Sequence, residues 1–358
     1  MTANLKRVES DRLPVFDNAQ SWRGPDMAAR TDWIYELDAS EIGEIDQAVS
    51  VFERSGADLV GMRRSDFPLG ALAGRMASLR HDLLHGRGFF LVRNVPVERY
   101  TTQQAAAAFL GLGLHLGEPV SQNGKGHILG HVKNLGADFS DPETRGYQTN
   151  SQLAFHTDFS DFVGLLCLKT PKEGGASSLA SSTTVWNEMV KRRPDLAQAL
   201  TAPVCYTRWG EIEPGQRRYS EVPVFTPHDG RMIVFFNARR TIMKAQAFPE
   251  VPRVTSQQLE ALDLLESIVH DPAIHMDMVL RTGDMQFLCN HYLFHTRTSY
   301  EDWPEMARRR HLLRLWLACE EGPALPAFMT EFQGRTASGR PAGIHVPGVP
   351  FKAPLEAE

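Results

Sequence analysis

Residues 222–236 read VPVFTPHDGRMIVFF, in which two apolar runs stand on either side of Asp229 and Gly230. An Asp-Gly pair between two apolar runs is a strong signal for a β-hairpin with a two-residue turn. Apolar runs of strand length recur at 89–96, 162–170, 275–295 and 310–318, and the run at 275–295 is broken at 282–284. Many short strands joined by turns predict a mainly β protein, a sandwich or jelly roll with helices packed outside it.

Helical spacing of apolar residues predicts helices over 66–84, 101–117 and 256–269, and another within 183–200 that is broken at Pro194. We see no linker that would divide the chain, so we expect a single domain over 1–358. Its parts are an N-terminal extension with helices over about 1–87 and a β core with helical insertions over 88–320. A Pro- and Gly-rich tail over 321–358 is expected to lie on the surface.

Composition narrows the class of protein. The chain has 358 residues, 42% of them hydrophobic and 23% charged, and a formal net charge of −5. This balance argues against nucleic acid or an anionic membrane as a partner. The N-terminal residues lack the apolar core of a signal peptide, so we expect a cytoplasmic protein that acts on a small molecule. Its four scattered cysteines are expected to be buried thiols, and assembly into a homo-oligomer is left open.

A His-x-Asp pair stands inside the stretch QLAFHTDFSDF, residues 152–162. In an extended strand, His156 and Asp158 would project to the same face. An imidazole and a carboxylate directed at one point form half of a metal site, although the same pair is also common at an exposed strand edge. The rest of the chain has to decide between these readings.

The missing half would be a histidine on a neighbouring strand farther along the chain. Mononuclear iron oxygenases use two imidazoles and one carboxylate, and leave the opposite face of the metal open. The stretch CNHYLFHTRTSYED offers two candidates, His291 and His295. His127 and His131 are spaced four residues apart, but they lie in a glycine-flanked stretch and we interpret them as structural.

A basic strand follows. In RRRHLLRLWLA, residues 308–318, strand alternation places Arg310, Leu312, Arg314 and Trp316 on one face. A buried guanidinium without a partner is costly, so both arginines must meet an anion or water. A carboxylate bound through two parallel hydrogen bonds is the natural partner.

These elements together resemble a known family. From about Gly88 to Ala318 the sequence is similar to the iron(II)/2-oxoglutarate-dependent dioxygenases of the taurine dioxygenase and 2,4-dichlorophenoxyacetate dioxygenase type (TauD/TfdA-like, clavaminate synthase-like). The resemblance implies a double-stranded β-helix (jelly-roll) core with flanking helices. It also implies that His156, Asp158 and His295 are the iron ligands, so that His295 is preferred to His291.

The same resemblance assigns the cosubstrate residues. In PKEGGASSLAS, Ser177 matches the hydroxyl that helps to bind 2-oxoglutarate, although Ser178 beside it leaves the match open by a position or two. Arg310 is expected to pair with the distal carboxylate of 2-oxoglutarate, and Arg314 to lie beside it or to contact the substrate. One departure is Thr296, which stands where the family often has glycine.

Fe(II), 2-oxoglutarate and O₂ are therefore the expected cofactors and cosubstrates. The expected reaction is oxidation, foremost hydroxylation, of a C–H bond of a small carboxylate-bearing molecule, with formation of succinate and CO₂. Related halogenases replace the ligand carboxylate by Gly or Ala, so its presence as Asp158 favours hydroxylation.

Two questions stay open at this point. One is the substrate site. Candidate substrate-binding residues lie just before the His-x-Asp pair and in FFNARR, residues 235–240: Tyr147, Gln148, Asn150, Gln152, Arg239 and Arg240. Both stretches can equally be interpreted as surface loops. A jelly-roll metal-binding protein without oxygenase activity, or a zinc hydrolase, would be the alternative function.

Overall fold

The structure is a computed structural model that describes residues 13–137, 146–212, 215–331 and 334–358. Within these residues a seven-stranded sheet runs in the order β1-β2-β14-β6-β17-β3, and β5 also pairs with β17. Its strands are β1 (Ile34–Glu36), β2 (Phe89–Arg93), β3 (Glu118–Pro119), β5 (Leu129–Lys133), β6 (Phe162–Lys169), β14 (Met285–Cys289) and β17 (His311–Ala318). Strands β1 and β2 are parallel, and the other pairs are antiparallel.

A smaller antiparallel sheet has the order β13-β8-β15, from β8 (Ser177–Ser181), β13 (His275–Met278) and β15 (Leu293–Arg297). The chain passes directly from β14 of the large sheet to β15 of the small one. Shorter pairings complete the β structure: β9 (Pro203–Thr207) with β10 (Tyr219–Pro223), β7 (Glu173–Gly174) with β16 (Tyr300–Glu301), and β4 (Ser121–Gln122) with β18 (Gly343–Ile344).

The predicted hairpin is confirmed. Strands β11 (Phe225–His228) and β12 (Arg231–Val234) pair antiparallel around Asp229 and Gly230. The φ angles of these two turn residues are 47° and 71°, and positive φ at both positions is what a type I′ turn requires.

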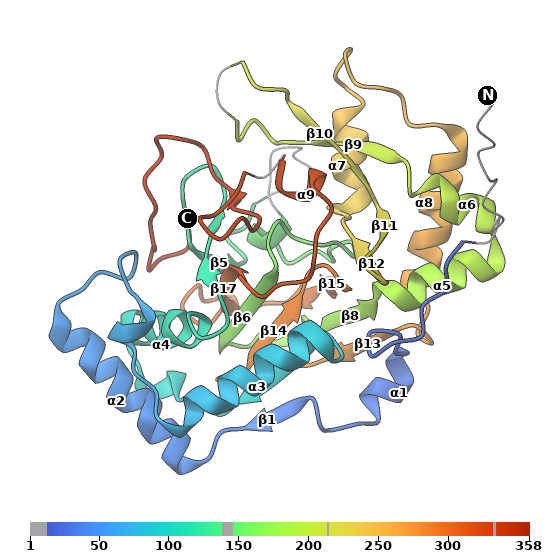
Figure 1. Cartoon of the computed structure of the whole chain (residues 1–358). Helices are drawn as coiled ribbons and strands as arrows, with labels where there is room; N and C mark the ends of the chain where they lie inside the picture. The colour runs from blue at the N-terminus through green and yellow to red at the C-terminus, as the bar shows by residue number, and fades with distance from the viewer. Residues whose placement is uncertain (1–12, 138–145, 213–214, 332–333) are drawn as a thin grey trace, which may run out of the picture.

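Helices lie on both sides of the strands (Figure 1). The helices α3 (Ala71–His85) and α4 (Thr102–Gly113) pack on the large sheet, and α2 (Ala39–Ser55) packs against these two helices. A second apolar core joins the hairpin β11-β12 to α5 (Ser182–Arg192), α6 (Pro194–Ala199) and α8 (Ser256–Val269). The remaining helices are α1 (Gly24–Ala28), α7 (Ala238–Ala245) and α9 (Phe328–Glu331), with single 3₁₀ turns at Arg64–Asp66, Val97–Arg99 and Gly146–Gln148.

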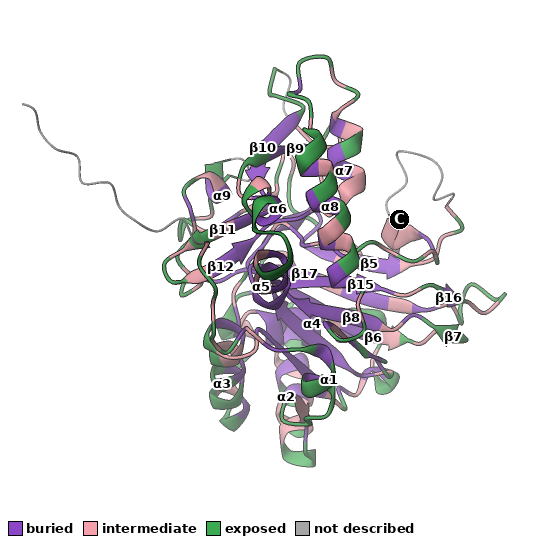
Figure 2. Cartoon of the chain, turned by 90° about the vertical axis from the view of Figure 1, so that its right-hand side faces the viewer, coloured by how far each residue is buried: buried purple, intermediate pink, exposed green. Residues whose placement is uncertain are grey.

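Burial follows this layering: the strands are largely buried, whereas α6 and α8 expose their outer sides (Figure 2). All four cysteines are buried and free, as predicted. None of the described helices has the length and apolar character needed to cross a membrane.

Several of the predicted helix boundaries agree with the structure. Helix α8 spans the predicted 256–269, Thr101 caps α4 in a capping box, and Pro194 begins α6 after the break. The helix expected from residue 66 begins instead at Ala71, because Pro68 disfavours helical backbone at the residue before it. Helices α2 and α7 were not predicted.

The tail after residue 320 is more than the surface covering we expected. It adds β18 to β4, and Arg340 forms an ion pair with Asp161, whose side chain is fully buried. The C-terminal residues are therefore tied to the interior close to the His-x-Asp segment.

Candidate active site

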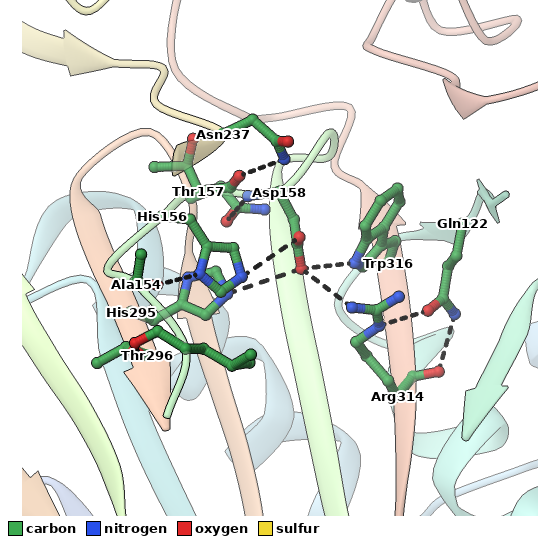
Figure 3. Close-up of polar contacts among 12 residues, drawn as sticks. Gln122, Ala154, His156, Thr157, Asp158, Asn237, His295, Thr296, Arg314 and Trp316 are labelled. Carbon is green, nitrogen blue, oxygen red and sulfur yellow. Dashed lines mark hydrogen bonds and ion pairs between the residues drawn. The ribbon is translucent and has the colours of Figure 1, made fainter. Parts of the chain in front are cut away.

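The structure brings His156, Asp158 and His295 together, with their ligand atoms within 4.8 Å of one another (Figure 3). The segment that carries His156 is not part of a regular strand, contrary to expectation; it meets β15 through an isolated antiparallel bridge. In this bridge the His156 amide donates to the His295 carbonyl at 3.0 Å, and the His295 amide donates back at 2.9 Å. Directly opposed residues project to the same side, which explains why the two imidazoles converge.

The tautomer of His156 is fixed by its neighbour. Its Nδ1 lies 2.9 Å from the Ala154 carbonyl, which can only accept, so Nδ1 carries the proton. The lone pair of Nε2 is then directed toward Asp158, whose Oδ1 lies 3.9 Å away. Burial, with a smaller contribution from His295, lowers the pKa of His156 to about 4. The imidazole is therefore neutral at pH 7, as a metal ligand must be.

The Asp158 carboxylate is oriented through one of its oxygens. Its Oδ2 accepts a hydrogen bond from Trp316 Nε1 at 2.9 Å and lies 3.7 Å from Arg314 Nη1. Burial alone would raise the pKa of Asp158, but Arg314 and His295 outweigh it and hold that pKa below its ordinary value. The Asp158 amide donates to Asn290 Oδ1 at 3.1 Å, which fixes the backbone of the segment.

Arg314 lies beside the three clustered residues. Its Nε donates to Gln122 Oε1 at 2.7 Å, and the Gln122 amide donates back to the Arg314 carbonyl at 2.9 Å. Its guanidinium also lies 5.2 Å from the ring centroid of Tyr147 and 5.0 Å from that of Trp316. The sequence placed Trp316 on the same strand face as Arg314 but gave it no role, and no sequence signal pointed to Gln122.

Arg310 lies just before β17 and is buried. Its backbone amide donates to Asp302 Oδ1 at 2.7 Å, and its guanidinium lies 5.2 Å from the Tyr300 ring centroid. The Nη1 atom is buried and has no hydrogen-bond partner among the described residues. Gly175 comes so close that a Cβ there would stand 3.2 Å from Arg310 Nε. The Gly-Gly segment that leads into β8 therefore contacts this arginine.

Strand register distinguishes Ser177 from Ser178. In the pairing of β8 with β15, Ser177 is opposite Arg297, which is two residues from His295 and on the same face. The Ser177 hydroxyl donates to Gln286 of the large sheet at 3.0 Å. Ser178 instead bonds a carboxylate on β13 of its own sheet. Ser177 is thus the serine between the two sheets.

A cavity of about 420 Å³ opens at His156 and Asp158. Its other lining residues are Gln122, Asn123, Gly146, Tyr147, Gln152, Leu153, Ala154, Phe159, Trp209, Asn237, Ala238, Arg240, Thr241, Arg314, Trp316 and Ile344. Three of the predicted substrate residues, Tyr147, Gln152 and Arg240, belong to this wall.

The other three predicted substrate residues do not line this cavity and have partners elsewhere. Gln148 donates to the backbone carbonyl of Glu358, and Asn150 donates to that of Tyr300. Arg239 forms ion pairs with two carboxylates of α8. Successive residues of a helix point about 100° apart, so Arg240 faces the cavity while Arg239 faces α8.

Arg297 holds the loop that carries the first group of wall residues. Its guanidinium donates to the backbone carbonyls of Thr149, at 3.0 Å, and Ser151. Burial lowers the pKa of Arg297 to about 10, so it remains charged at neutral pH. A charged donor thus orders a loop that has little regular structure of its own.

The two other candidate histidines, His291 and His131, have structural partners. His291 Nε2 lies 2.7 Å from Asp161 Oδ1, so it is not one of the three clustered residues. His131 is hydrogen-bonded to His311 at 2.8 Å and to a carbonyl of the C-terminal segment. These contacts agree with the structural interpretation given to His131 and with the preference for His295 over His291.

The sequence signature of the taurine catabolism dioxygenase TauD, TfdA family matches residues 54–316. The chain belongs to this family. A curated relative, FR-33289 synthase of Streptomyces rubellomurinus, is 30% identical over 343 residues, which cover 93% of this chain and 99% of the relative. The uridine-5'-phosphate dioxygenase of an Amycolatopsis species is 29% identical over 59% of this chain and 78% of its own length.

Solved structures show the same fold at low identity. An asparagine oxygenase in complex with Fe(II), 3-hydroxyasparagine and succinate aligns with a TM-score of 0.61 and 18% identity, over 87% of this chain and 98% of that chain. The non-haem iron oxygenase OrfP in complex with Fe and alpha-ketoglutaric acid aligns with a TM-score of 0.60 and 17% identity, over 86% and 99%. As a member of the family, the chain is an iron(II)- and 2-oxoglutarate-dependent dioxygenase.

Proposed function

We propose that His156, Asp158 and His295 hold the Fe(II) of this dioxygenase. The observation that carries the proposal is their convergence: two imidazoles and one carboxylate lie within 4.8 Å of one another at the end of a cavity. The donor set fits the ion, since His156 is neutral with Nε2 free and Asp158 is charged. Asp158 Oδ1 lies 3.9 Å from His156 Nε2, and Asp158 Oδ2, which accepts from Trp316, lies 3.7 Å from His295 Nε2, so the carboxylate would face the metal between the two imidazoles.

Arg310 is proposed to bind the distal carboxylate of 2-oxoglutarate, with Ser177 as a second contact. The support is the buried Arg310 Nη1, which lacks a protein partner among the described residues. A buried guanidinium with an unsatisfied donor is costly, and a carboxylate would supply the missing acceptors. Gly175 brings the start of β8 against Arg310, in line with a shared subsite for both residues.

When bound together, Fe(II), 2-oxoglutarate and O₂ supply an oxidant that hydroxylates a C–H bond, with release of succinate and CO₂. The chain's own part is orientation and shielding. Trp316 orients the Asp158 carboxylate, and Asn290 fixes the backbone of Asp158 by accepting from its amide. The aromatic wall of the cavity limits the access of water to the reacting end. The two sheets that enclose this end are proposed to form a double-stranded β-helix.

The substrate is proposed to be a small anionic molecule, such as a carboxylate. Arg240 and Arg314 both line the cavity, and Asp158 is the acidic residue among its lining side chains. Once the metal neutralises Asp158, the charge of Arg314 beside it is no longer offset by this carboxylate, which favours an anion at this end of the cavity. The relative named for uridine-5'-phosphate is also named for an anion.

Anaerobic addition of Fe(II) and 2-oxoglutarate tests the proposal. A chelated oxo-acid gives a weak visible charge-transfer band, which should appear with the wild type and disappear in Asp158→Ala. Admitting O₂ should then release succinate. A metal-binding protein without oxygenase activity would bind Fe(II) but give no succinate, and a zinc hydrolase would turn over its substrate without O₂.

A further inference from the structure

The C-terminal segment takes part in the cavity although it lies outside residues 54–316, the stretch that matches the family. Strand β18 pairs in parallel with β4, so that Gly343 is opposite Ser121 and Ile344 is opposite Gln122. Gln122 is the residue that holds the Arg314 guanidinium. The segment is therefore one hydrogen-bonded step away from the residues around Asp158.

Gly343 makes this close pairing possible. Its φ is 71°, and a Cβ at this position would stand 2.2 Å from the Ser121 carbonyl oxygen. An L-residue with a side chain would therefore be both strained and in collision. The glycine lets the backbone lie against β4, and the next side chain, Ile344, enters the cavity wall.

The segment is held at both ends. On one side, Arg340 Nε donates to Asp161 Oδ2 at 2.8 Å, and its Nη1 donates to the Pro323 carbonyl. On the other side, the Lys352 amide donates to the Gly126 carbonyl at 2.8 Å, and the Ile128 amide donates to the Lys352 carbonyl. Ile344 lies between these attachments, so its position is fixed by the fold rather than by its own packing alone.

Ile344 lies between two hollows, together with two aromatic residues. One is the cavity of about 420 Å³ that contains His156 and Asp158, and the other is a smaller hollow of about 40 Å³ lined by Tyr206 and Ser220. Phe159, Trp209 and Ile344 line both hollows. The two aromatic residues belong to the part of the chain that matches the family, whereas Ile344 comes from the tail.

We propose that Ile344 is a specificity-determining residue, which closes the substrate cavity toward the smaller hollow and so limits the length of the substrate. This inference rests on the proposed function, because it takes the larger cavity as the substrate site. A smaller side chain would join the two hollows and admit a longer molecule. A larger side chain would shorten the space in front of the metal residues.

The test uses straight-chain alkylsulfonates, from ethanesulfonate to octanesulfonate, as probes. Their anionic head matches the two arginines of the cavity, and their unbranched tail measures its length. Each probe is titrated into anaerobic enzyme loaded with Fe(II) and 2-oxoglutarate, and binding is followed as a change in the visible band. The variants are Ile344→Ala and Ile344→Phe, with Val346→Ala as the control because Val346 lies in the same segment but lines neither hollow.

The Ile344→Ala variant should bind a chain two carbons longer about tenfold more tightly than the wild type does, because two more methylenes leave water. The Ile344→Phe variant should prefer shorter chains, and Val346→Ala should match the wild type. If the visible band itself does not form, the proposed function fails and this inference fails with it. If the band forms but all variants share one preferred chain length, or bind none of the probes, only the inference is overturned.

Discussion

The molecule contains two His-x-Asp pairs with almost the same internal geometry. His156 Nε2 lies 3.9 Å from Asp158 Oδ1, and His275 Nε2 lies 3.8 Å from Asp277 Oδ1. The second pair even lies in a regular strand, β13, where the spacing brings both side chains to one face. By sequence pattern and by distance alone, the two pairs are equivalent.

Their surroundings separate them. His156 is bridged to His295, whereas His275 is opposite Ala180 in the small sheet, which offers no ligand. The Asp158 side chain is 6% exposed and that of Asp277 is 53% exposed. In the part of the chain that the structure describes, only the first pair is joined by a third residue that could bind a metal. A His-x-Asp motif therefore indicates a metal site only where it is buried and where the residue paired with its histidine can also bind a metal.

The largest expected effect is the loss of hydroxylation in Asp158→Ala. Two imidazoles without the carboxylate bind Fe(II) weakly, so succinate formation should fall below detection. Asp277→Ala is the matched control and should keep wild-type activity, because its carboxylate is exposed and lies in the other pair. Both variants are assayed for Fe(II) binding and succinate release. Full activity in Asp158→Ala would show that Asp158 is not a metal ligand and that the two pairs do not differ as proposed.

Replacing either of the two candidate histidines tests the role of His295, the residue paired with His156. His295→Ala should lose most Fe(II) affinity, whereas His291→Ala should retain it. Removing His291 leaves the buried Asp161 with one hydrogen bond fewer, so this variant should lose about 1–3 kcal/mol of unfolding free energy. Equilibrium metal binding and urea unfolding of both variants give the two readings. Metal loss in His291→Ala alone would move the ligand to the other histidine.

A third prediction concerns cosubstrate rather than metal. Arg310→Ala would leave the distal carboxylate of 2-oxoglutarate without its buried partner, which costs about 2–5 kcal/mol, or roughly 30- to 5000-fold in affinity. Arg310→Lys should lose less, since it keeps the charge but not the planar fork. Fe(II) binding without 2-oxoglutarate should stay unchanged. Titration of 2-oxoglutarate measures the concentration that each variant requires. If this concentration rises only in Arg314→Ala, the carboxylate is bound by Arg314 and not by Arg310.

The smallest expected effect is on stability at acidic pH. It concerns His131 and His311, which are hydrogen-bonded to each other and not to a carboxylate. Burial, and then His131, lower the pKa of His311 to about 3, against about 6.5 in an unfolded chain. Between those values the unfolded chain binds the extra proton, so stability is complete above about pH 6.5 and falls as the pH falls toward 3. The slope from this one group is at most about 1.4 kcal/mol per pH unit.

The variant His311→Gln removes this titration. Its unfolding free energy, measured by urea titration at several pH values between neutral and about pH 4, should fall less steeply on acidification than that of the wild type. Parallel slopes for the two proteins would show that the His131–His311 pair does not contribute to the pH dependence.

The sequence predicted the clustered residues at one end of the cavity and part of its wall, namely Tyr147, Gln152, Arg240 and Arg314, but not the rest of the wall. Strand alternation placed Arg310, Arg314 and Trp316 on one face, because side-chain direction in a strand repeats every two residues. The preference for His295 over His291 came from the family resemblance. The walls come from segments without such a period. FFNARR was interpreted as a possible loop, and in a loop nothing distinguishes Arg239 from Arg240; in the helix α7 that forms there, they point in different directions.

Gln122 and Ile344 were missed for a different reason. They meet in a pairing of two-residue strands more than 200 positions apart in the chain, as their numbers show, and the contact depends on the backbone of Gly343. Local patterns carry no information on such a pairing. The tail therefore looked like surface covering, although it supplies part of the wall.

The hydrogen bond from Trp316 to Asp158 also gives the protein an optical reporter. The indole Nε1 lies 2.9 Å from the carboxylate oxygen, so a paramagnetic ion held by Asp158 would stand in near contact with this fluorophore. Tryptophan emission should accordingly be quenched as Fe(II) binds, before any cosubstrate or oxygen is present. Trp316→Phe should remove most of this quenching, because Trp316 is the tryptophan hydrogen-bonded to Asp158, while the emission of the other five tryptophans in the sequence persists. Occupancy of the centre can then be followed by light emission alone, with no turnover.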